Sequence, residues 1–161
     1  MKTCCFIGHR KVEETPELLE RLRKTIKELI CKNDVDTFLF GSKSQFDELC
    51  LKITKLLKCV HPEIKLIYYR SHFQHISAEY ENYLLKIYDN TLMPKGMENS
   101  GRASYVERNQ KMIDASNFCV FYYDENYTPS LEKQTKSGTT VAYQYAVKKK
   151  KTIINLFNKK D

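Results

Sequence analysis

Residues 117–157 of the chain read NFCVFYYDENYTPSLEKQTKSGTTVAYQYAVKKKKTIINLF, and this stretch decides how we interpret the fold. The apolar run 118–123 predicts a strand, Lys136-Ser137-Gly138-Thr139-Thr140 begins a predicted helix, and 152–157 predicts a second strand. In α/β proteins such a hydroxyl-rich helix start holds anionic groups, because free backbone N–H groups and the positive helix end point at the ligand. The same residues are equally typical of an ordinary helix N-cap, so the turn alone leaves both interpretations open.

The length and composition predict one globular domain. A chain of 161 residues can bury a sizeable core, and 42% hydrophobic and 29% charged residues are ordinary proportions for a globular protein. No apolar run approaches the roughly 18 residues of a membrane span, and the apolar start is too short for a signal peptide. We therefore expect a cytoplasmic protein with no membrane partner.

The net charge of +7 comes largely from one part of the chain. Lys148, Lys149, Lys150, Lys151, Lys159 and Lys160 lie near the C-terminus, and without these six the net charge is +1. A lysine run at a helix end is typical of a solvated face that complements the helix dipole. On this ground we disfavour nucleic acid as a partner.

The six cysteines predict neither a disulfide framework nor a metal centre. They lie in or near predicted strands and helices without a CxxC pair, which is typical of buried free thiols in a reducing compartment. The spacings of Cys59, His61, His72 and His75 fit none of the usual zinc patterns, so we predict no metal site.

The rest of the chain alternates short apolar runs with amphipathic segments. Strands are predicted at 3–7, 35–40 and 64–69, and helices at 16–31, 46–57, 78–88 and 103–115. Residues 89–101 predict a long loop. This alternation predicts an α/β fold with a doubly wound, mainly parallel sheet of five strands in the order 3-2-1-4-5, covered by helices on both faces.

That strand order predicts where a ligand binds. The winding direction reverses between the first and fourth strands, and ligands of such sheets bind beyond the carboxyl ends of the strands at this switch point. The loops there are Gly8-His9-Arg10 and residues 124–139. The unusual helix start at Ser137 belongs to the second loop, which favours a ligand site over a simple N-cap.

Several single residues near this site keep two interpretations. His9 either contacts the ligand or packs under its loop. We interpret Asp47 as a first-turn carboxylate that the helix dipole favours, in preference to a residue of the pocket. Of each pair Tyr68–Tyr69 and Tyr122–Tyr123, one ring should face the core, while the other is free to stack on a base.

Four short motifs occur in a fixed order along the chain. They are Phe6-Ile7-Gly8-His9-Arg10, Phe40-Gly41-Ser42 followed by Phe46-Asp47, Arg108-Asn109-Gln110-Lys111-Met112-Ile113-Asp114, and Ser137-Gly138-Thr139 followed by Tyr145-Ala146. With them the chain resembles, over nearly its whole length, the small bacterial YspA/YpsA-like proteins. These belong to the SLOG superfamily of Rossmann-like domains, together with the DNA-processing protein DprA and the cytokinin-activating Lonely-guy enzymes. The resemblance implies one Rossmann-like domain over residues 1–161 with a variable loop at about 89–101.

The resemblance also implies a pocket that binds or senses a nucleotide or a nucleotide-derived ligand such as an ADP-ribose-like molecule. The residues implied to line it are Gly8, His9, Arg10, Gly41, Ser42, Arg108, Asn109, Ser137, Gly138 and Thr139. Arginines offer forked donors for phosphate, and an asparagine suits a ribose hydroxyl or a base edge. We expect no required cofactor, only such a bound nucleotide. A homodimer and an unidentified effector protein stay open as partners.

The chain departs from the Lonely-guy hydrolases at one decisive position. Those enzymes carry a glutamate three residues after the turn threonine, where this chain has Ala142. Without that carboxylate, no residue is identified that could transfer a proton to the leaving base. We therefore favour binding over catalysis and predict no catalytic residue. Hydrolysis of the N-glycosidic bond of nucleoside 5′-monophosphates is the alternative. A further alternative is DprA-like binding of single-stranded nucleic acid through Lys148–Lys151, which we call the lysine block.

Overall fold

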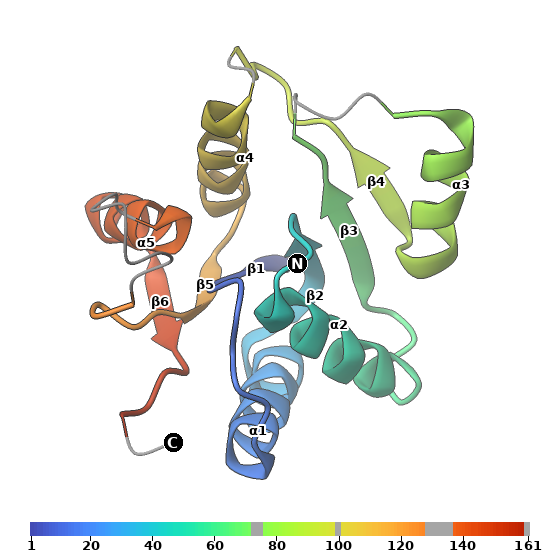
Figure 1. Cartoon of the computed structure of the whole chain (residues 1–161). Helices are drawn as coiled ribbons and strands as arrows, with labels where there is room; N and C mark the ends of the chain where they lie inside the picture. The colour runs from blue at the N-terminus through green and yellow to red at the C-terminus, as the bar shows by residue number, and fades with distance from the viewer. Residues whose placement is uncertain (72–75, 99–100, 128–136, 160–161) are drawn as a thin grey trace.

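A parallel sheet of six strands organises the chain, as the computed structural model shows for residues 1–71, 76–98, 101–127 and 137–159 (Figure 1). The strands are β1 (Lys2–Gly8), β2 (Val35–Phe40), β3 (Lys65–Tyr69), β4 (Asn90–Leu92), β5 (Phe118–Tyr122) and β6 (Thr152–Asn155). The helices are α1 (Pro16–Asn33), α2 (Gln45–Lys58), α3 (Ala78–Ile87), α4 (Arg102–Asp114) and α5 (Gly138–Lys148). Every neighbouring pair of strands is parallel, and the order is β4-β3-β2-β1-β5-β6. The predicted α/β class is confirmed.

The prediction of five strands is wrong by one, because β4 lies inside the segment predicted as a loop. This strand has only three residues, and its polar Asn90 and Thr91 give no apolar pattern. Its stability comes from tertiary pairing: Tyr68 and Thr91 are register partners, and the Thr91 hydroxyl donates to the Tyr68 carbonyl at 3.0 Å. Apart from this added strand, the order of the predicted strands is the observed one.

Side chains alternate between two cores because successive residues of a strand face opposite sides of the sheet. Cys4 and Phe6 of β1 pack with α1, α2 and α3, whereas Cys5 and Ile7 pack with α4 and α5. Figure 1 shows α1 and α2 on one side of the sheet and α4 and α5 on the other. Burial of each large apolar side chain in these layers contributes roughly 1.5–3 kcal/mol to folding.

The cysteines are free, but only four are buried as predicted. Cys4, Cys5, Cys50 and Cys119 are buried, whereas Cys31 and Cys59 are exposed on helix surfaces. No helix in the described part of the chain is long and apolar enough to cross a lipid bilayer.

The two edges of the parallel sheet serve to locate the helix ends and loops in the molecule. We call the edge where strands end the carboxyl edge, and the edge where they begin the amino edge. Helix α5 starts after β5 and finishes before β6, so it runs from the carboxyl edge to the amino edge. The Ser137-Gly138-Thr139 turn and the lysines 148–151 therefore lie at opposite edges of the sheet.

Candidate ligand site at the carboxyl edge

His9 occupies the predicted switch point, where β1 and β5 end side by side. Its side chain is 2% exposed, and its Nε2 accepts a hydrogen bond from the Asp124 backbone N–H at 2.8 Å. Burial lowers the pKa of His9, an effect that the nearby Asp124 carboxylate opposes. The ring is therefore neutral near pH 7 with its proton on Nδ1, and this buried donor has no hydrogen-bond partner among the described residues. His9 packs under its loop and still presents an unused donor.

Aromatic rings gather beside this histidine. Tyr127 stacks on His9 with ring centroids 3.9 Å apart, and Tyr123 stacks on Tyr143 at 4.4 Å. Tyr122 packs against the core of α1 and α2, whereas Tyr123 packs against that of α4 and α5. Both rings of the predicted Tyr122–Tyr123 pair are half-buried, so each retains some exposed surface. Sequence analysis did not identify Tyr127 and Tyr143, because no sequence spacing predicts that they meet other rings.

Gly8 has a packing role at this edge. A Cβ at Gly8 would lie 2.3 Å from Cδ2 of Phe46 and 2.7 Å from its Cβ, closer than real atoms approach. The glycine thus allows the first turn of α2 to pack directly on the end of β1. Loop contacts reinforce this arrangement, because the Arg10 carbonyl accepts from the Gln45 N–H at 2.9 Å. The Arg10 side chain itself is exposed.

Arg108 crosses the carboxyl end of β2. A Cβ at Gly41 would lie 2.9 Å from Nε of Arg108, so the structure brings together these two predicted site residues. The Arg108 side chain is 5% exposed, its Nη2 donates to Oδ1 of Asn109 at 3.3 Å, and its guanidinium lies over the Tyr105 ring at 5.3 Å. Burial lowers the pKa of Arg108, with Tyr68 and Asp47 opposing, but a guanidinium stays charged. Its Nε is buried without a partner among the described residues.

Asp47 lies in the first turn of α2, as its interpretation as a helix-dipole carboxylate predicted, and it also belongs to the same cluster. The side chain is 4% exposed and accepts hydrogen bonds from the hydroxyls of Ser42 and Ser44. Burial raises the pKa of Asp47 to about 6, although both serines and the Arg108 charge act in the opposite direction. Its Oδ1 has no hydrogen-bond partner in the described part of the chain. The serines that precede it in the sequence were the available signal for this buried role.

Other unpartnered polar atoms lie close by in the fold. The buried side-chain atoms without a hydrogen-bond partner among the described residues are His9 Nδ1, Asp47 Oδ1, Arg70 Nε, Ser71 Oγ, Tyr80 Oη and Arg108 Nε. The Tyr80 hydroxyl lies near that of Tyr68, whose raised pKa comes from burial first and from Tyr80 second. All six residues follow a strand end, lie in the first turn of the next helix, or cross the strand ends from α4. Since buried polar groups are normally hydrogen-bonded, this concentration makes the carboxyl edge our candidate for a ligand site.

The predicted phosphate turn serves as a helix cap and also leaves room for a ligand. The Ser137 hydroxyl accepts from the Thr140 N–H at 3.1 Å, and Thr139 is buried. Among the described residues, no atom of another segment lies within 4 Å of the position that a Cβ at Gly138 would take. The Thr140 amide is thus capped, whereas the amides of Gly138 and Thr139 lie in the first helical turn, where no intrahelical acceptor is available. In the described ranges, the hydrogen bonds of Ser137 stay within α5, to Thr140 and Val141.

The structure adds little evidence on the predictions that the chain has no catalytic residue and no metal site. Ala142, which replaces the Lonely-guy glutamate, is 2% exposed and packs in the core beneath α4 and α5. The proposed set of Cys59, His61, His72 and His75 lies partly outside the described residues, because positions 72–75 are not described.

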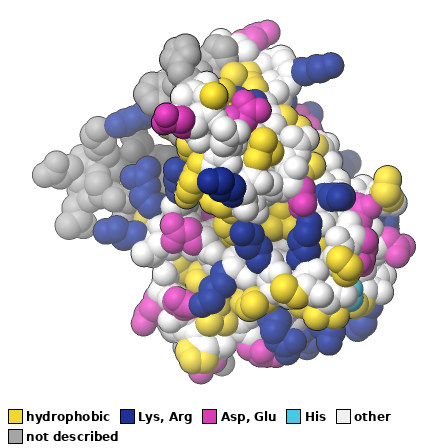
Figure 2. Space-filling model, turned by 90° about the vertical axis from the view of Figure 1, so that its right-hand side faces the viewer, with side chains coloured by type: hydrophobic (Ala, Val, Ile, Leu, Met, Phe, Trp, Pro, Cys, Tyr) yellow, Lys and Arg dark blue, Asp and Glu magenta, His cyan; other side chains and the backbone are white. Residues whose placement is uncertain are grey.

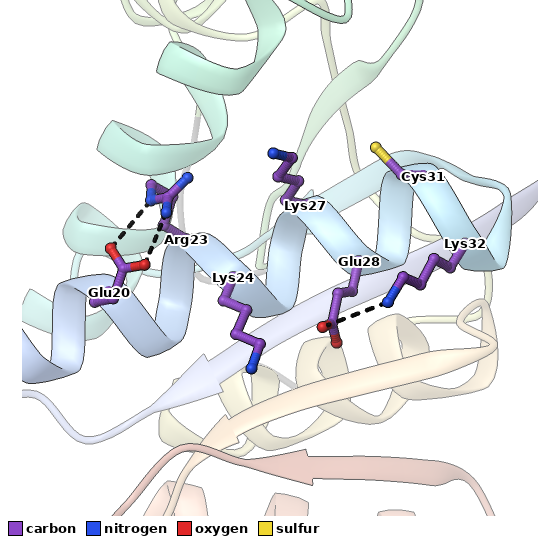
Figure 3. A pocket seen from close by; sticks show the side chains of 7 residues that line it. All are labelled: Glu20, Arg23, Lys24, Lys27, Glu28, Cys31 and Lys32. Atoms are coloured by element: carbon purple, nitrogen blue, oxygen red, sulfur yellow. Dashed lines mark hydrogen bonds and ion pairs between the residues drawn. The ribbon is translucent and has the colours of Figure 1, made fainter.

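Two hollows on the surface lie away from the switch point. The first, of about 330 Å³, is lined by side chains of α1 alone, with Glu20 paired to Arg23 and Glu28 to Lys32 (Figure 3). A single helix face with internally paired charges brings no separate elements together, so it carries no site. The second, of about 520 Å³, lies between the ends of β3 and β4 and the last turns of α4.

Comparisons with known proteins bear on the fold. No protein-family model matches the chain, and no curated protein sequence matches it. The fold is similar to a solved structure that concerns the single-stranded DNA binding mode of DNA processing protein A from Helicobacter pylori, with a TM-score of 0.57 and 16% identity. The match covers 94% of this chain and 63% of that one. Our expectation that nucleic acid is a disfavoured partner is thus contradicted, because this structural neighbour binds single-stranded DNA.

Proposed function

We propose that the chain binds single-stranded nucleic acid along the carboxyl edge of its sheet. The observation that carries this proposal is the similarity over 94% of the chain to a protein that binds single-stranded DNA. The motifs from Gly8 to Thr139 and this fold together support placement in the SLOG superfamily as part of the same proposal.

The carboxyl edge supplies the two kinds of contact that single strands need. Open amides at the start of α5, beside Gly138, suit a phosphate group because the helix dipole favours negative charge there. The half-buried rings of Tyr123 and Tyr127 suit stacked bases, which bind aromatic faces with little dependence on sequence. The unused Nδ1 donor of His9 belongs to a ring that stacks on Tyr127.

The lysine block is a weaker candidate for the strand-binding surface. It lies at the amino edge, and Lys151 is engaged there, because its Nζ donates to the Ser116 carbonyl at 2.9 Å. The proposal therefore relocates the single-strand interaction from the lysines to the other end of α5.

A mononucleotide-type ligand is the second candidate for the carboxyl edge. The buried, unpartnered atoms of Asp47 and Arg108 favour it, because a small ligand with both donors and acceptors would satisfy them. Thermal denaturation with AMP and ADP-ribose separates the candidates. A ligand at about 100 times its Kd stabilises by about 2.7 kcal/mol, a shift of roughly 5–10 °C for a domain of this size.

Fluorescence anisotropy with a labelled 20-nucleotide single strand tests the main proposal. Gly138→Val adds side-chain atoms at the start of α5, where a Cβ would meet no described atom within 4 Å, so it should fold normally and weaken binding about tenfold. Lys149→Ala at the other end of α5 is the matched control, and we expect a change of at most about twofold. Wild-type affinity in Gly138→Val, or equal affinity for a duplex of the same sequence, would contradict the proposal.

A further inference from the structure

The cavity of about 520 Å³ lies at the ends of β3 and β4, away from the switch point, and the proposed function does not yet use it. Its floor is formed by Tyr69 and Leu92, which are register partners on β3 and β4 and so lie on the same face of the sheet. One wall is the last turns of α4, and the other is the segment that follows β4. Tyr69, Leu92 and Met93 are all half-buried, so the floor presents an accessible apolar surface.

The charges at this cavity are arranged for an anion. Lys95 and Lys111 line it from opposite walls, together with Asp114. Gly96, in the left-handed conformation with φ 78°, lets the segment after β4 approach α4, and its Cβ position would lie 3.2 Å from Nζ of Lys111. Asp114 already accepts from the Tyr145 hydroxyl at 2.8 Å. The two lysines and Asp114 leave a net charge of +1 at the cavity, which favours an anionic ligand.

We propose that this cavity holds one unstacked nucleotide of a bound single strand, an inference that rests on the proposed function. The base would lie on Tyr69, Leu92 and Met93, and Lys95 and Lys111 would contact its phosphate. The cavity volume falls within the usual range of roughly 300–1,000 Å³ for small-molecule sites. Burial raises the pKa of Tyr69, so its hydroxyl stays neutral beside the base.

The combination of surfaces favours a nucleotide over a purely apolar occupant. A single strand is bound by positive grooves in which aromatic rings alternate with basic side chains. The space-filling view of the side that includes β4 and α3 shows Lys and Arg side chains among hydrophobic and acidic ones (Figure 2). An apolar peptide segment in the cavity would leave Lys95 and Lys111 without a negatively charged partner from the ligand.

Photocrosslinking locates the base directly. A single strand that carries 5-iododeoxyuridine at successive positions is irradiated with the wild-type chain, and the adduct is mapped by mass spectrometry. We expect an adduct at Tyr69 or Met93 from at least one position.

The matched affinity test uses the double variants Lys95→Ala/Lys111→Ala and, as the control, Lys24→Ala/Lys27→Ala on the hollow of α1 (Figure 3). Both remove two positive charges from surface positions. Loss of two phosphate contacts should weaken strand binding roughly tenfold and reduce the salt slope by about 1.4. The control should leave both values close to those of the wild type.

The outcomes separate this inference from the proposed function. If the wild type binds the strand but the double variant keeps its affinity and slope, or adducts map only to Tyr123 and Tyr127, the cavity proposal is wrong and the proposed function stands. If the wild type does not bind the strand, both are wrong. An unchanged melting temperature of the double variant excludes loss of folding as the cause of weaker binding.

Discussion

The amino and carboxyl edges of the sheet differ in how their polar side chains are hydrogen-bonded. At the amino edge, Lys58 at the end of α2 forms an ion pair with Asp89 at 2.6 Å and donates to the Ile64 carbonyl at 2.8 Å. Asp89 also accepts from the Leu66 N–H at 2.8 Å. At the carboxyl edge, Asp47 and Arg108 are more deeply buried, yet each keeps an atom without a partner in the described ranges.

This difference teaches how to recognise a site without a bound ligand. Groups that only support the fold are placed so that each finds a partner, because an unsatisfied buried group costs roughly 1–3 kcal/mol. Folds violate this rule mainly at functional sites, where the partner arrives with the ligand. Positive charge is a weaker guide, since the lysine block of α5 lies at the edge where polar groups are satisfied.

The largest expected effect contrasts two glycines of the carboxyl edge. Gly8→Ala forces a Cβ to within 2.3 Å of Phe46, and we expect it to destabilise the fold by about 3 kcal/mol. Gly138→Ala meets no atom within 4 Å, and it should leave stability unchanged or raise it by up to about 1 kcal/mol. Urea denaturation of both variants measures the contrast. Equal stability of the two would show that Gly8 is not held against α2.

A second prediction uses the pH dependence of stability at Asp47. Burial raises its pKa to about 6, so between pH 4 and 6 the folded state keeps a proton that the unfolded state has released. This contribution to stability is fully present below about pH 4 and is lost as the pH rises through about 6. Asp47→Asn cannot ionise, so its stability relative to wild type should rise by roughly 3 kcal/mol from pH 4 to pH 7.

Asp89 is the matched control for that measurement. Burial alone would raise its pKa, but the pKa is lowered because the hydrogen bonds from Lys58 and Leu66 and the charges of Lys58 and Lys65 together outweigh burial. Its contribution is therefore present above its ordinary pKa and is lost as the pH falls. Asp89→Asn should be most destabilising at pH 7 and less so in acid, the reverse of Asp47→Asn. Urea midpoints at pH 4, 5, 6 and 7 measure the stability of each variant relative to wild type. If this relative stability changes with pH in the same direction for both variants, the contrast between the edges is contradicted.

The fold could be predicted from sequence largely because its elements carry strong local patterns. The apolar runs of β1, β2 and β5 and the N-cap at Ser137 lie where the sequence predicted them. Strand β4 could not be predicted, because three residues hold no pattern and its pairing with β3 is a tertiary effect.

The candidate site was predictable only in part. The topology rule identified Gly8, His9 and the start of α5, because the strand order fixes which loops meet. The burial of Asp47 and the stacking of Tyr127 on His9 depend on how α2 and the loop after β5 pack, and no residue spacing encodes these contacts. Conversely, the most conspicuous feature of the sequence, its lysine block, lies away from that site.

The smallest expected effect tests the lysine block itself. Lys150 has a left-handed backbone with φ 55°, whereas its neighbour Lys149 has φ −80°. Glycine adopts the left-handed conformation without strain, so Lys150→Gly should stabilise the chain by about 0.5 kcal/mol, while Lys149→Gly should destabilise it by a similar amount. Both variants remove one positive charge from the amino edge. Because we place the strand at the carboxyl edge, both should bind a labelled single strand within about twofold of wild type, and an equal, larger loss in both would move the interaction to the lysines.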